Sequence, residues 1–261
     1  MIIDGKKQAA LIKEQAKNQI TTNKISPVLK VVSVGDDDAS AVYLKNKQKA
    51  CEEVGIKFIH QKLPQNATDD EVICAISDKN ADGIMLQFPL PPHLNSKKIA
   101  QQIPPSKDID GIGPMAHFAP CTADACMELI KSTGVNLTGK HAVVVGRSRV
   151  IGQPLALMLL NSNCTVTVCH SHTQDLSTIT RQADILCAAV GKINLITKEM
   201  VKKGAIVIDV GINSTQKGIC GDVDFDGVFE IASLITPVPG GVGPVTTAIL
   251  MKNVVSACLS K

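Results

Sequence analysis

The chain has almost no aromatic side chains: its 261 residues include no Trp, one Tyr (Tyr43) and five Phe. A core built from this sequence must therefore be aliphatic. So few rings also leave almost nothing on which nucleic-acid bases could stack, which argues against a single-stranded nucleic-acid binder. The formal net charge of +3 is too small to indicate a polyanion as partner. We therefore predict no nucleic-acid partner.

Other signals are also missing. The nine cysteines contain no Cys-x-x-Cys pair, and no histidines stand at zinc-ligand spacing from the closest pairs, Cys121/Cys126 and Cys164/Cys169, so we predict no metal site. The first residues are amphipathic rather than leader-like, and by inspection no stretch approaches a membrane span. We expect a cytoplasmic protein without a membrane partner, whose cysteines are mostly small buried hydrophobes in a reducing compartment.

The first part of the chain alternates between helical and strand patterns, which predicts a small α/β domain. Gly55 is expected to end one of its helices, and three aspartates at 36–38 predict a polar turn. The expected strands are 28–35, 57–63 and 83–88, and the expected helices are 6–20, 39–54 and 67–80.

The second part begins after a link at 103–122 that is rich in Pro and Gly. Its strands, separated by helical or polar crossovers, predict a doubly wound, Rossmann-like parallel sheet. Helices are expected at 122–131, from about 152, and at 245–259, and strands at 142–145, 165–169, 185–190, 206–210 and 234–235.

The central motif of this second part is HAVVVGRSRVIGQP, residues 141–154. A buried strand is followed by a turn at Gly146 and Ser148 and by a helix that begins near Gly152. This order suits a dinucleotide, whose pyrophosphate would rest on the helix N-terminus. The spacing departs from G-x-G-x-x-G, with Ser in the second place and one extra residue before the last Gly. The alternative is a glycine turn in an ordinary α/β crossover.

The next strand ends at His170-Ser171. NAD-binding folds usually carry an Asp or Glu at this position for the ribose 2′-hydroxyl. In this sequence Arg147 and the polar residues 170–172 stand where that acidic residue would be expected. An arginine with hydroxyl donors suits a 2′-phosphate. The residues therefore favour NADP over NAD. The alternatives are a solvated loop cation for Arg147 and ordinary strand-end polarity for the histidines.

Three residues of the first part and one of the link could carry chemistry. Tyr43 and Lys47 are four apart on a predicted helix and share a face, so the tyrosine could position a lysine that moves protons if desolvation lowers its pKa. Gln87 ends a strand, where α/β sheets bind ligands, and Asp110 could accept two N–H donors. The alternatives are a solvated lysine face and, for Asp110, ordinary Asp-Gly turn chemistry.

A glycine-rich loop at 235–244, ITPVPGGVGP, lacks the Lys-Ser/Thr of a Walker loop and predicts backbone close to a ligand. With these motifs assembled, the sequence closely resembles the bifunctional methylenetetrahydrofolate dehydrogenase/methenyltetrahydrofolate cyclohydrolase family. The matching segments run in order over nearly the whole chain: YLKNKQKACEEVGI, ADGIMLQFPLPPHL, PSKDIDGIGP, PCTADA, VVVGRSRVIGQP, VTVCHSHT, GAIVIDVGIN, GDVDF and ITPVPGGVGPVTTAIL.

The resemblance implies two α/β domains flanking a cleft. Residues 1–120 with the helix 245–261 would form the folate and catalytic domain, and 121–244 the NADP-binding domain. It also implies roles for single residues. Lys47, Tyr43 and Gln87 would be catalytic; Asp110, Tyr43, Gln87, Pro239, Gly240 and Gly241 would bind substrate; and Gly146, Arg147, Ser148, Ile151, His170, Ser171 and Ile212 would bind NADP.

The implied chemistry is the oxidation of 5,10-methylenetetrahydrofolate with NADP, followed by hydrolysis to 10-formyltetrahydrofolate. Lys47 would be the general acid/base of the second step. The expected setting is a homodimer in one-carbon metabolism and purine biosynthesis. The link 111–120 is shorter than in most relatives, and PCTA at 120–123 replaces the commoner PCTP. The alternatives are a dehydrogenase that has lost the hydrolytic step through this link, and a non-catalytic NADP sensor.

Overall fold

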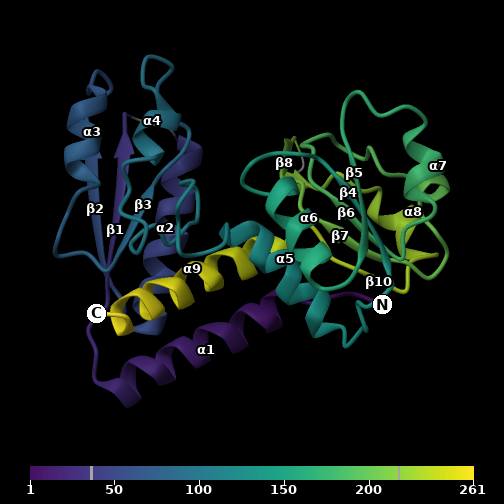
Figure 1. The fold of residues 1–261 in the computed structure, drawn as a ribbon, viewed down its shortest axis with the longest axis horizontal. Coiled ribbons are helices and arrows are strands. Elements are labelled where there is room, and N and C mark those ends of the chain that lie inside the picture. The colour runs from purple at the N-terminus through teal and green to yellow at the C-terminus, as the bar shows by residue number, and fades with distance from the viewer. Residues whose placement is uncertain (36–37, 217) are drawn as a thin grey trace. The chain divides into compact units, whose positions relative to one another are not determined.

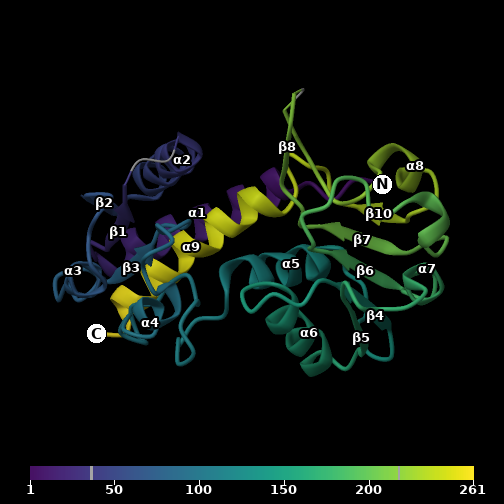
Figure 2. The ribbon, with the colours of Figure 1, turned by 90° about the horizontal axis from the view of Figure 1, so that it is seen from above.

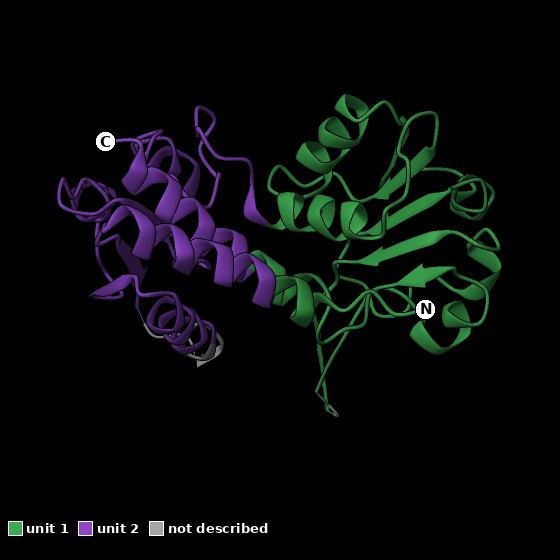
Figure 3. Ribbon diagram, turned by 90° about the horizontal axis from the view of Figure 1, so that it is seen from below, with its two compact units in different colours: residues 1–9, 122–246 green, residues 10–121, 247–261 purple. Residues whose placement is uncertain are grey.

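The computed structural model describes residues 1–35, 38–216 and 218–261, with no side-chain detail for 38–42. The chain forms two compact units (Figure 3). We call residues 10–121 with 247–261 the three-stranded unit, and residues 1–9 with 122–246 the five-stranded unit. The predicted domain boundaries place residues 1–9 in the first domain instead; those boundaries, and the functions attached to the two domains, stay predictions.

The three-stranded unit is built on a parallel sheet with the strand order β2-β1-β3. The central strand is buried along almost its whole length, whereas the edge strand β2 leaves several residues exposed. This matches the nearly continuous apolar run of the central strand. Helices flank the sheet (Figure 1). The elements are α1 (Gly5–Asn23), β1 (Val28–Val34), α2 (Asp38–Val54), β2 (Lys57–Leu63), α3 (Asp69–Ala75), β3 (Gly83–Leu86), α4 (Ser96–Ala100) and α9 (Val242–Leu259). The first turns of α1 and α9 belong to the five-stranded unit.

Local chemistry explains where these helices begin and end. Thr68 caps α3 through a capping box with Glu71, and Gly55 follows α2 with a φ of +93° that suits glycine. Helix α3 is shorter than the predicted 67–80. The Asp78 carboxylate accepts the N–H of Asn80 at 2.8 Å, a local turn that competes with further helix. Most of the predicted polar turn, at 36–37, lies outside the described residues.

The five-stranded unit is a parallel sheet with the strand order β10-β7-β6-β4-β5. Helices α7 and α8 lie on one face of it, and α5 and α6 on the other (Figure 2). The N–H of Ile3 donates to the carbonyl of Ile235 at 2.8 Å, so the first residues bridge to β10. The elements are α5 (Cys121–Ser132), β4 (His141–Val145), α6 (Gly152–Asn161), β5 (Thr165–Cys169), α7 (Leu176–Thr180), β6 (Ile185–Ala188), β7 (Ile206–Asp209), α8 (Phe225–Phe229) and β10 (Leu234–Ile235). The predicted α/β class and parallel sheet are confirmed.

Two features differ from the sequence predictions. A small antiparallel hairpin, β8 (Asn213–Thr215) with β9 (Gly218–Cys220), was not predicted. Helix α9 has the length and mean hydropathy of a membrane span, so the expectation that no stretch approaches one is wrong by that measure. However, 56% of its apolar window is buried inside the protein, as in the core helix of a globular fold.

Candidate active site

Lys47 and Gln87 meet in the three-stranded unit, although 40 residues separate them. Helix α2 carries the lysine, and Gln87 follows β3. The Lys47 Nζ donates to the Gln87 Oε1 at 2.8 Å, and the Gln87 Nε2 donates to the carbonyl of Phe88 at 2.7 Å. Because its NH₂ group is engaged, the amide must turn its oxygen toward the lysine. Gln87 is only 6% exposed, so this orientation is held within the core.

Asp110 lies in a loop wrapped around a second carboxylate. Buried Asp108 accepts the N–H groups of Gly111 at 3.1 Å, Ile112 at 3.3 Å and Gly113 at 2.7 Å. Gly111 has a φ of +69°, and a Cβ there would lie 2.6 Å from the backbone of residue 119, so the chain needs glycine at this point. Asp108 thus shapes the loop that presents Asp110.

Lys47 and Asp110 interact electrostatically. Burial lowers the pKa of the Lys47 ammonium, and the nearby charges of Asp110 and Cys121 oppose that shift. Burial raises the pKa of the Asp110 carboxyl, and the charge of Lys47 opposes it. A lysine with a lowered pKa holds a larger neutral fraction near neutral pH, which suits it to exchange protons.

Tyr43 is placed differently from the other three residues. It lies one helical turn before Lys47 and is 45% exposed. Among the described residues it makes no hydrogen bond to Lys47, so the predicted positioning contact does not form in this structure. The exposed phenol is free to meet a ligand, and its predicted role stays a prediction.

Sequence reasoning assigned no role to two further residues beside Asp110. The Cys121 thiol lies within hydrogen-bond reach of the Asp110 carboxylate and, at 3.1 Å, of the Ile109 carbonyl. From α9, buried Asn253 donates to the same carbonyl at 2.9 Å. The only signal in the sequence was an amide inside a mostly apolar helix.

The predicted dinucleotide turn lies in the five-stranded unit, between β4 and α6. Gly146 has a φ of +126°, and a Cβ there would lie 2.2 Å from the carbonyl oxygen of Ala189. A Cβ on Gly152 would lie 2.1 Å from the carbonyl oxygen of Gly146. The Ser148 hydroxyl accepts the N–H of Gly152 at 3.4 Å. Both glycines are therefore required by the close approach of backbone, as a turn that receives phosphates needs.

The polar groups at this edge suit a phosphate. Arg147 and Ser171 are exposed, as is Arg149, which sequence reasoning did not single out. Within the described residues neither guanidinium has a carboxylate partner. The first carboxylate after β5 is Asp175, which caps α7 by accepting the N–H of Thr178 at 3.3 Å. Arginines lie near this end of the sheet and no carboxylate directly follows β5, so the residues suit the 2′-phosphate of NADP.

The remaining predicted ligand-binding residues also lie in the five-stranded unit. Ile151 begins the turn into α6 and is partly buried, whereas Ile212 follows β7 and is 50% exposed. Gly240 has a φ of +108°, and a Cβ on Gly5 would lie 1.9 Å from the carbonyl oxygen of Gly241. The glycine loop thus packs its backbone against the start of α1. The roles predicted for these residues, and for Pro239, stay predictions.

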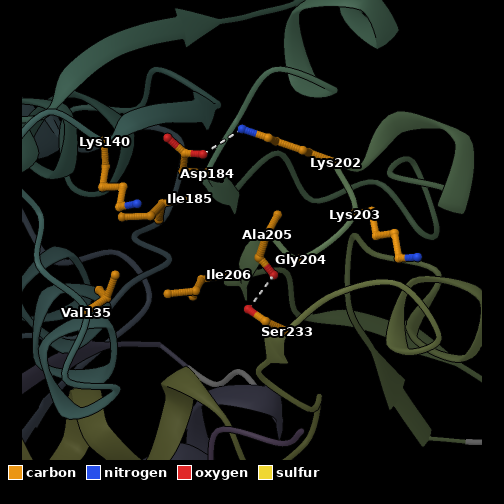
Figure 4. Close-up of a pocket in the computed structure, with 10 residues that line it drawn as sticks. All are labelled: Val135, Lys140, Asp184, Ile185, Lys202, Lys203, Gly204, Ala205, Ile206 and Ser233. Carbon is orange, nitrogen blue, oxygen red and sulfur yellow. Dashed lines mark hydrogen bonds and ion pairs between the residues drawn. The ribbon is translucent and has the colours of Figure 1, made fainter.

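A crevice of about 190 Å³ also opens in this unit, and its lining includes Lys140, Lys202, Lys203, Asp184 and Ser233 (Figure 4). These residues adjoin the amino ends of the parallel strands, whereas the predicted cofactor residues follow the carboxyl ends. The Lys202 Nζ donates to Asp184 at 2.7 Å. The crevice contains none of the predicted site residues. No group of three or more His, Cys, Asp or Glu able to hold a metal occurs in the described part of the chain.

A parallel sheet that ends in a glycine turn beside exposed arginines, and a partly buried lysine that is hydrogen-bonded to a buried amide and interacts with a carboxylate, are features of a dinucleotide-dependent α/β enzyme. Two family models match this chain. The catalytic domain of tetrahydrofolate dehydrogenase/cyclohydrolase matches residues 3–110, and the NAD(P)-binding domain of the same enzymes matches residues 120–261. The chain belongs to the tetrahydrofolate dehydrogenase/cyclohydrolase family.

Individual relatives match over nearly their whole length. The bifunctional protein FolD 2 of Desulfitobacterium hafniense is 46% identical over 269 residues, covering 97% of this chain and 95% of the relative. The crystal structure of the bifunctional FolD of Campylobacter jejuni has a TM-score of 0.96 and 44% identity, covering 100% and 99%. The Trypanosoma brucei enzyme, solved with NADP and an inhibitor, has a TM-score of 0.94 and 34% identity, covering 100% and 97%.

Proposed function

We propose that the chain catalyses two consecutive reactions of one-carbon metabolism. It oxidises 5,10-methylenetetrahydrofolate to 5,10-methenyltetrahydrofolate with NADP, and it hydrolyses that product to 10-formyltetrahydrofolate. The observation that carries this proposal is the Lys47–Gln87 hydrogen bond beside Asp110, in a chain that its family matches from end to end. A protein that only bound NADP would have no need for such a set.

In the oxidation the protein's task is orientation. NADP, when bound, supplies the acceptor for a hydride. Gly146, Arg147 and Ser148 would hold its phosphates beside Ile151, His170 and Ser171 would flank the 2′-phosphate, and Ile212 would lie at the nicotinamide end. Asp110 would accept two N–H donors of the pterin ring, and the Pro239–Gly241 backbone would bind the substrate as well.

In the hydrolysis water adds to the methenyl carbon of the cation and loses one proton, which gives a neutral hydroxyl adduct. The bond from this carbon to one ring nitrogen then breaks as that nitrogen is protonated, and the hydroxyl proton is released to solvent as the formyl C=O forms. Lys47 would take the first proton in its neutral form and return it to that nitrogen. Gln87 would keep the amine aimed, and Tyr43 would contact the folate. The lowered pKa of Lys47 supports this role because it makes the neutral amine accessible.

The test is a turnover assay with 5,10-methylenetetrahydrofolate and either NADP or NAD. NADPH formation and methenyl absorbance are followed separately. We expect NADPH to form with no methenyl accumulation. Accumulation beyond spontaneous hydrolysis would identify a dehydrogenase alone, a preference for NAD would contradict the 2′-phosphate assignment, and no turnover would leave only a sensor.

The shortened link gives no support to a dehydrogenase-only enzyme. Its two ends are joined, because the N–H of Cys121 donates to the carbonyl of Asp110 at 3.2 Å. The Lys47–Gln87 contact lies outside the link altogether. The residues to which we assign the hydrolysis, Tyr43, Lys47 and Gln87, therefore all lie outside the link.

We also propose a homodimer. Supporting it are the exposed apolar side chains on α6, Leu157 at 61% and Leu160 at 56%, and Val168 on the edge strand β5 at 39%. Light scattering should give twice the chain mass of 27.6 kDa. A Leu157→Lys/Leu160→Lys variant should give one chain mass, while Leu11→Lys, at another exposed leucine, should stay dimeric. A monomeric wild type would refute the dimer.

We further propose a cytoplasmic enzyme without membrane or nucleic-acid partners, whose formyl product supports purine biosynthesis. The nine cysteines form no disulfide in the part of the chain that the structure describes, which supports a reducing compartment. Fractionation of cells that express the tagged protein would test the location.

A further inference from the structure

One carboxylate of the five-stranded unit gathers an unusual number of donors. Asp222 is fully buried. It accepts the N–H groups of Val190 at 2.7 Å, Gly191 at 3.0 Å and Lys192 at 2.8 Å, and the side-chain amide of Asn213 at 3.0 Å. These four bonds tie together two loops that are distant in sequence, 190–192 and 211–213.

A second carboxylate holds the first in place. Asp209, at the end of β7, accepts the N–H groups of Gly211 at 3.0 Å, Asp222 at 2.9 Å and Val223 at 3.0 Å. Its own N–H donates to the Thr236 hydroxyl at 2.7 Å. The backbone of Asp222 is thus fixed independently of what its side chain does.

Glycine is required where the backbone passes these carboxylates. A Cβ on Gly211 would lie 2.3 Å from an oxygen of Asp222, and one on Gly221 would lie 1.8 Å from an oxygen of Asp209. The segments 210–213 (VGIN) and 221–224 (GDVD) therefore pack closely against each other. Such a fitted arrangement fixes loop geometry closely, because every donor has one acceptor and no room to shift.

The two loops lie at the carboxyl-terminal end of the sheet, which is where open α/β sheets bind their ligands. Loop 190–192 follows β6 and loop 211–213 follows β7, as the Gly146 turn follows β4, and the carboxyl ends of parallel strands meet at one edge. Exposed Ile212 lies between Gly211 and Asn213. We propose that Asp222 is a positioning residue for NADP: its carboxylate holds loops 190–192 and 211–213 in the shape that receives the cofactor. This inference rests on the proposed function.

The test is Asp222→Asn, which keeps the size but offers one accepting oxygen to four donors. NADPH binding is followed by nucleotide fluorescence, which is clean because the chain has no Trp. We expect the Kd for NADPH to rise at least tenfold and the amides of 190–192 to exchange faster with deuterium. Hydrolysis of 5,10-methenyltetrahydrofolate without cofactor should stay within twofold. Asp226→Asn, at an exposed aspartate of the same unit, should change none of these.

A milder variant keeps the test valid if the first one unfolds. Asn213→Ala removes one donor and leaves the three backbone bonds, and it should raise the Kd about threefold. Faster exchange at 190–192 with an unchanged Kd would overturn the inference, as would joint loss of cofactor binding and cofactor-free hydrolysis, which would indicate general unfolding. Wild-type protein that fails to bind NADPH would instead refute the proposed function.

Discussion

Each unit holds a set of polar groups that are buried or partly buried, and the two sets differ in how many of their hydrogen-bonding groups are satisfied within the protein. In the three-stranded unit the Lys47 ammonium, with three protons, has Gln87 as its one hydrogen-bond partner among the described residues. In the five-stranded unit Asp209 and Asp222 together accept six backbone N–H groups and one side-chain amide. The first set still has donors that can bind a ligand. In the second set nearly all hydrogen-bonding capacity is used within the protein.

The difference separates two uses of burial. Desolvation that backbone donors offset gives a rigid scaffold, because each buried charge is matched by fixed dipoles. A desolvated group with few hydrogen-bond partners has a shifted pKa, and its protonation changes easily. Perturbed pKa values occur in both units, so the pKa alone does not distinguish them; the count of satisfied donors and acceptors does.

The largest effect is expected at Lys47. Lys47→Met removes the proton carrier and should lower the hydrolysis of 5,10-methenyltetrahydrofolate about 10²- to 10⁴-fold, the usual contribution of general acid–base catalysis. NADPH binding should be unchanged. Lys49→Met, two residues along the same helix on an exposed side chain, is the matched control. If the Lys47→Met variant retained hydrolysis, the first set would not be the proton-transfer site, and the contrast between the two sets would not hold.

The pH dependence of stability should reveal Asp209. Burial raises the pKa of its carboxyl from 3.8 to about 6 despite the opposing hydrogen bonds. The native state then binds more protons than the unfolded state between these values, so this group's contribution to stability falls as pH rises from about 4 to about 6. The loss reaches up to about 3 kcal/mol.

Urea unfolding of the wild type and of Asp209→Asn at pH 4.5 and pH 6.5 would measure this contribution. The stability of the wild type relative to the variant should be lower at pH 6.5. A difference that is independent of pH would mean that the carboxyl titrates at its ordinary value in the folded protein.

Asn253 lies beside the first set, and its substitution should show whether it positions Asp110 or only stabilises the fold. Asn253→Leu leaves the buried Ile109 carbonyl without its amide donor, which should cost about 1–3 kcal/mol of unfolding free energy. If the residue also positions Asp110, KM for the folate should rise severalfold while the Kd for NADPH stays constant. A change in stability with an unchanged KM would place Asn253 with the scaffold. Lys252→Ala is the adjacent control.

The smallest effect is expected at Thr68, which is remote from both sets. Thr68→Ala removes the hydroxyl that accepts the N–H of Glu71 and should destabilise the protein by about 1 kcal/mol. Both kinetic activities should remain at wild-type values. The variant therefore measures how much a loss of stability alone changes the kinetic activities and the Kd for NADPH.

Much of the fold was predictable because its strands are apolar runs between turn residues. The bounds of β2 and β5 match the predicted 57–63 and 165–169. The hairpin β8–β9 was missed because its strands are only three residues long and β8, Asn213–Thr215, is entirely polar. Short polar strands carry no periodic signal.

The site was predictable only in part. Resemblance brought Lys47, Gln87 and Asp110 together, because nothing local links residues 40 apart. The hydrogen-bonding roles of Asp209 and Asp222 could not be predicted from the sequence, since six of their seven donors are backbone N–H groups, which leave no mark on residue type. The exposure of Tyr43 likewise depends on packing around α2.

The clasp between Asp110 and Cys121 has a consequence for how this chain can be altered. The main chain is joined at both ends of 111–120, Asp108 holds residues 111–113, and the N–H of His117 donates to the carbonyl of Pro105. An insertion between these anchored residues should therefore add mainly closure entropy, and doubling the length of a flexible loop costs only about 0.6 kcal/mol. The link is thus a natural insertion point. A peptide tag or a small sensor domain could be spliced near Met115, an exposed residue at its tip, while Asp110 keeps its place.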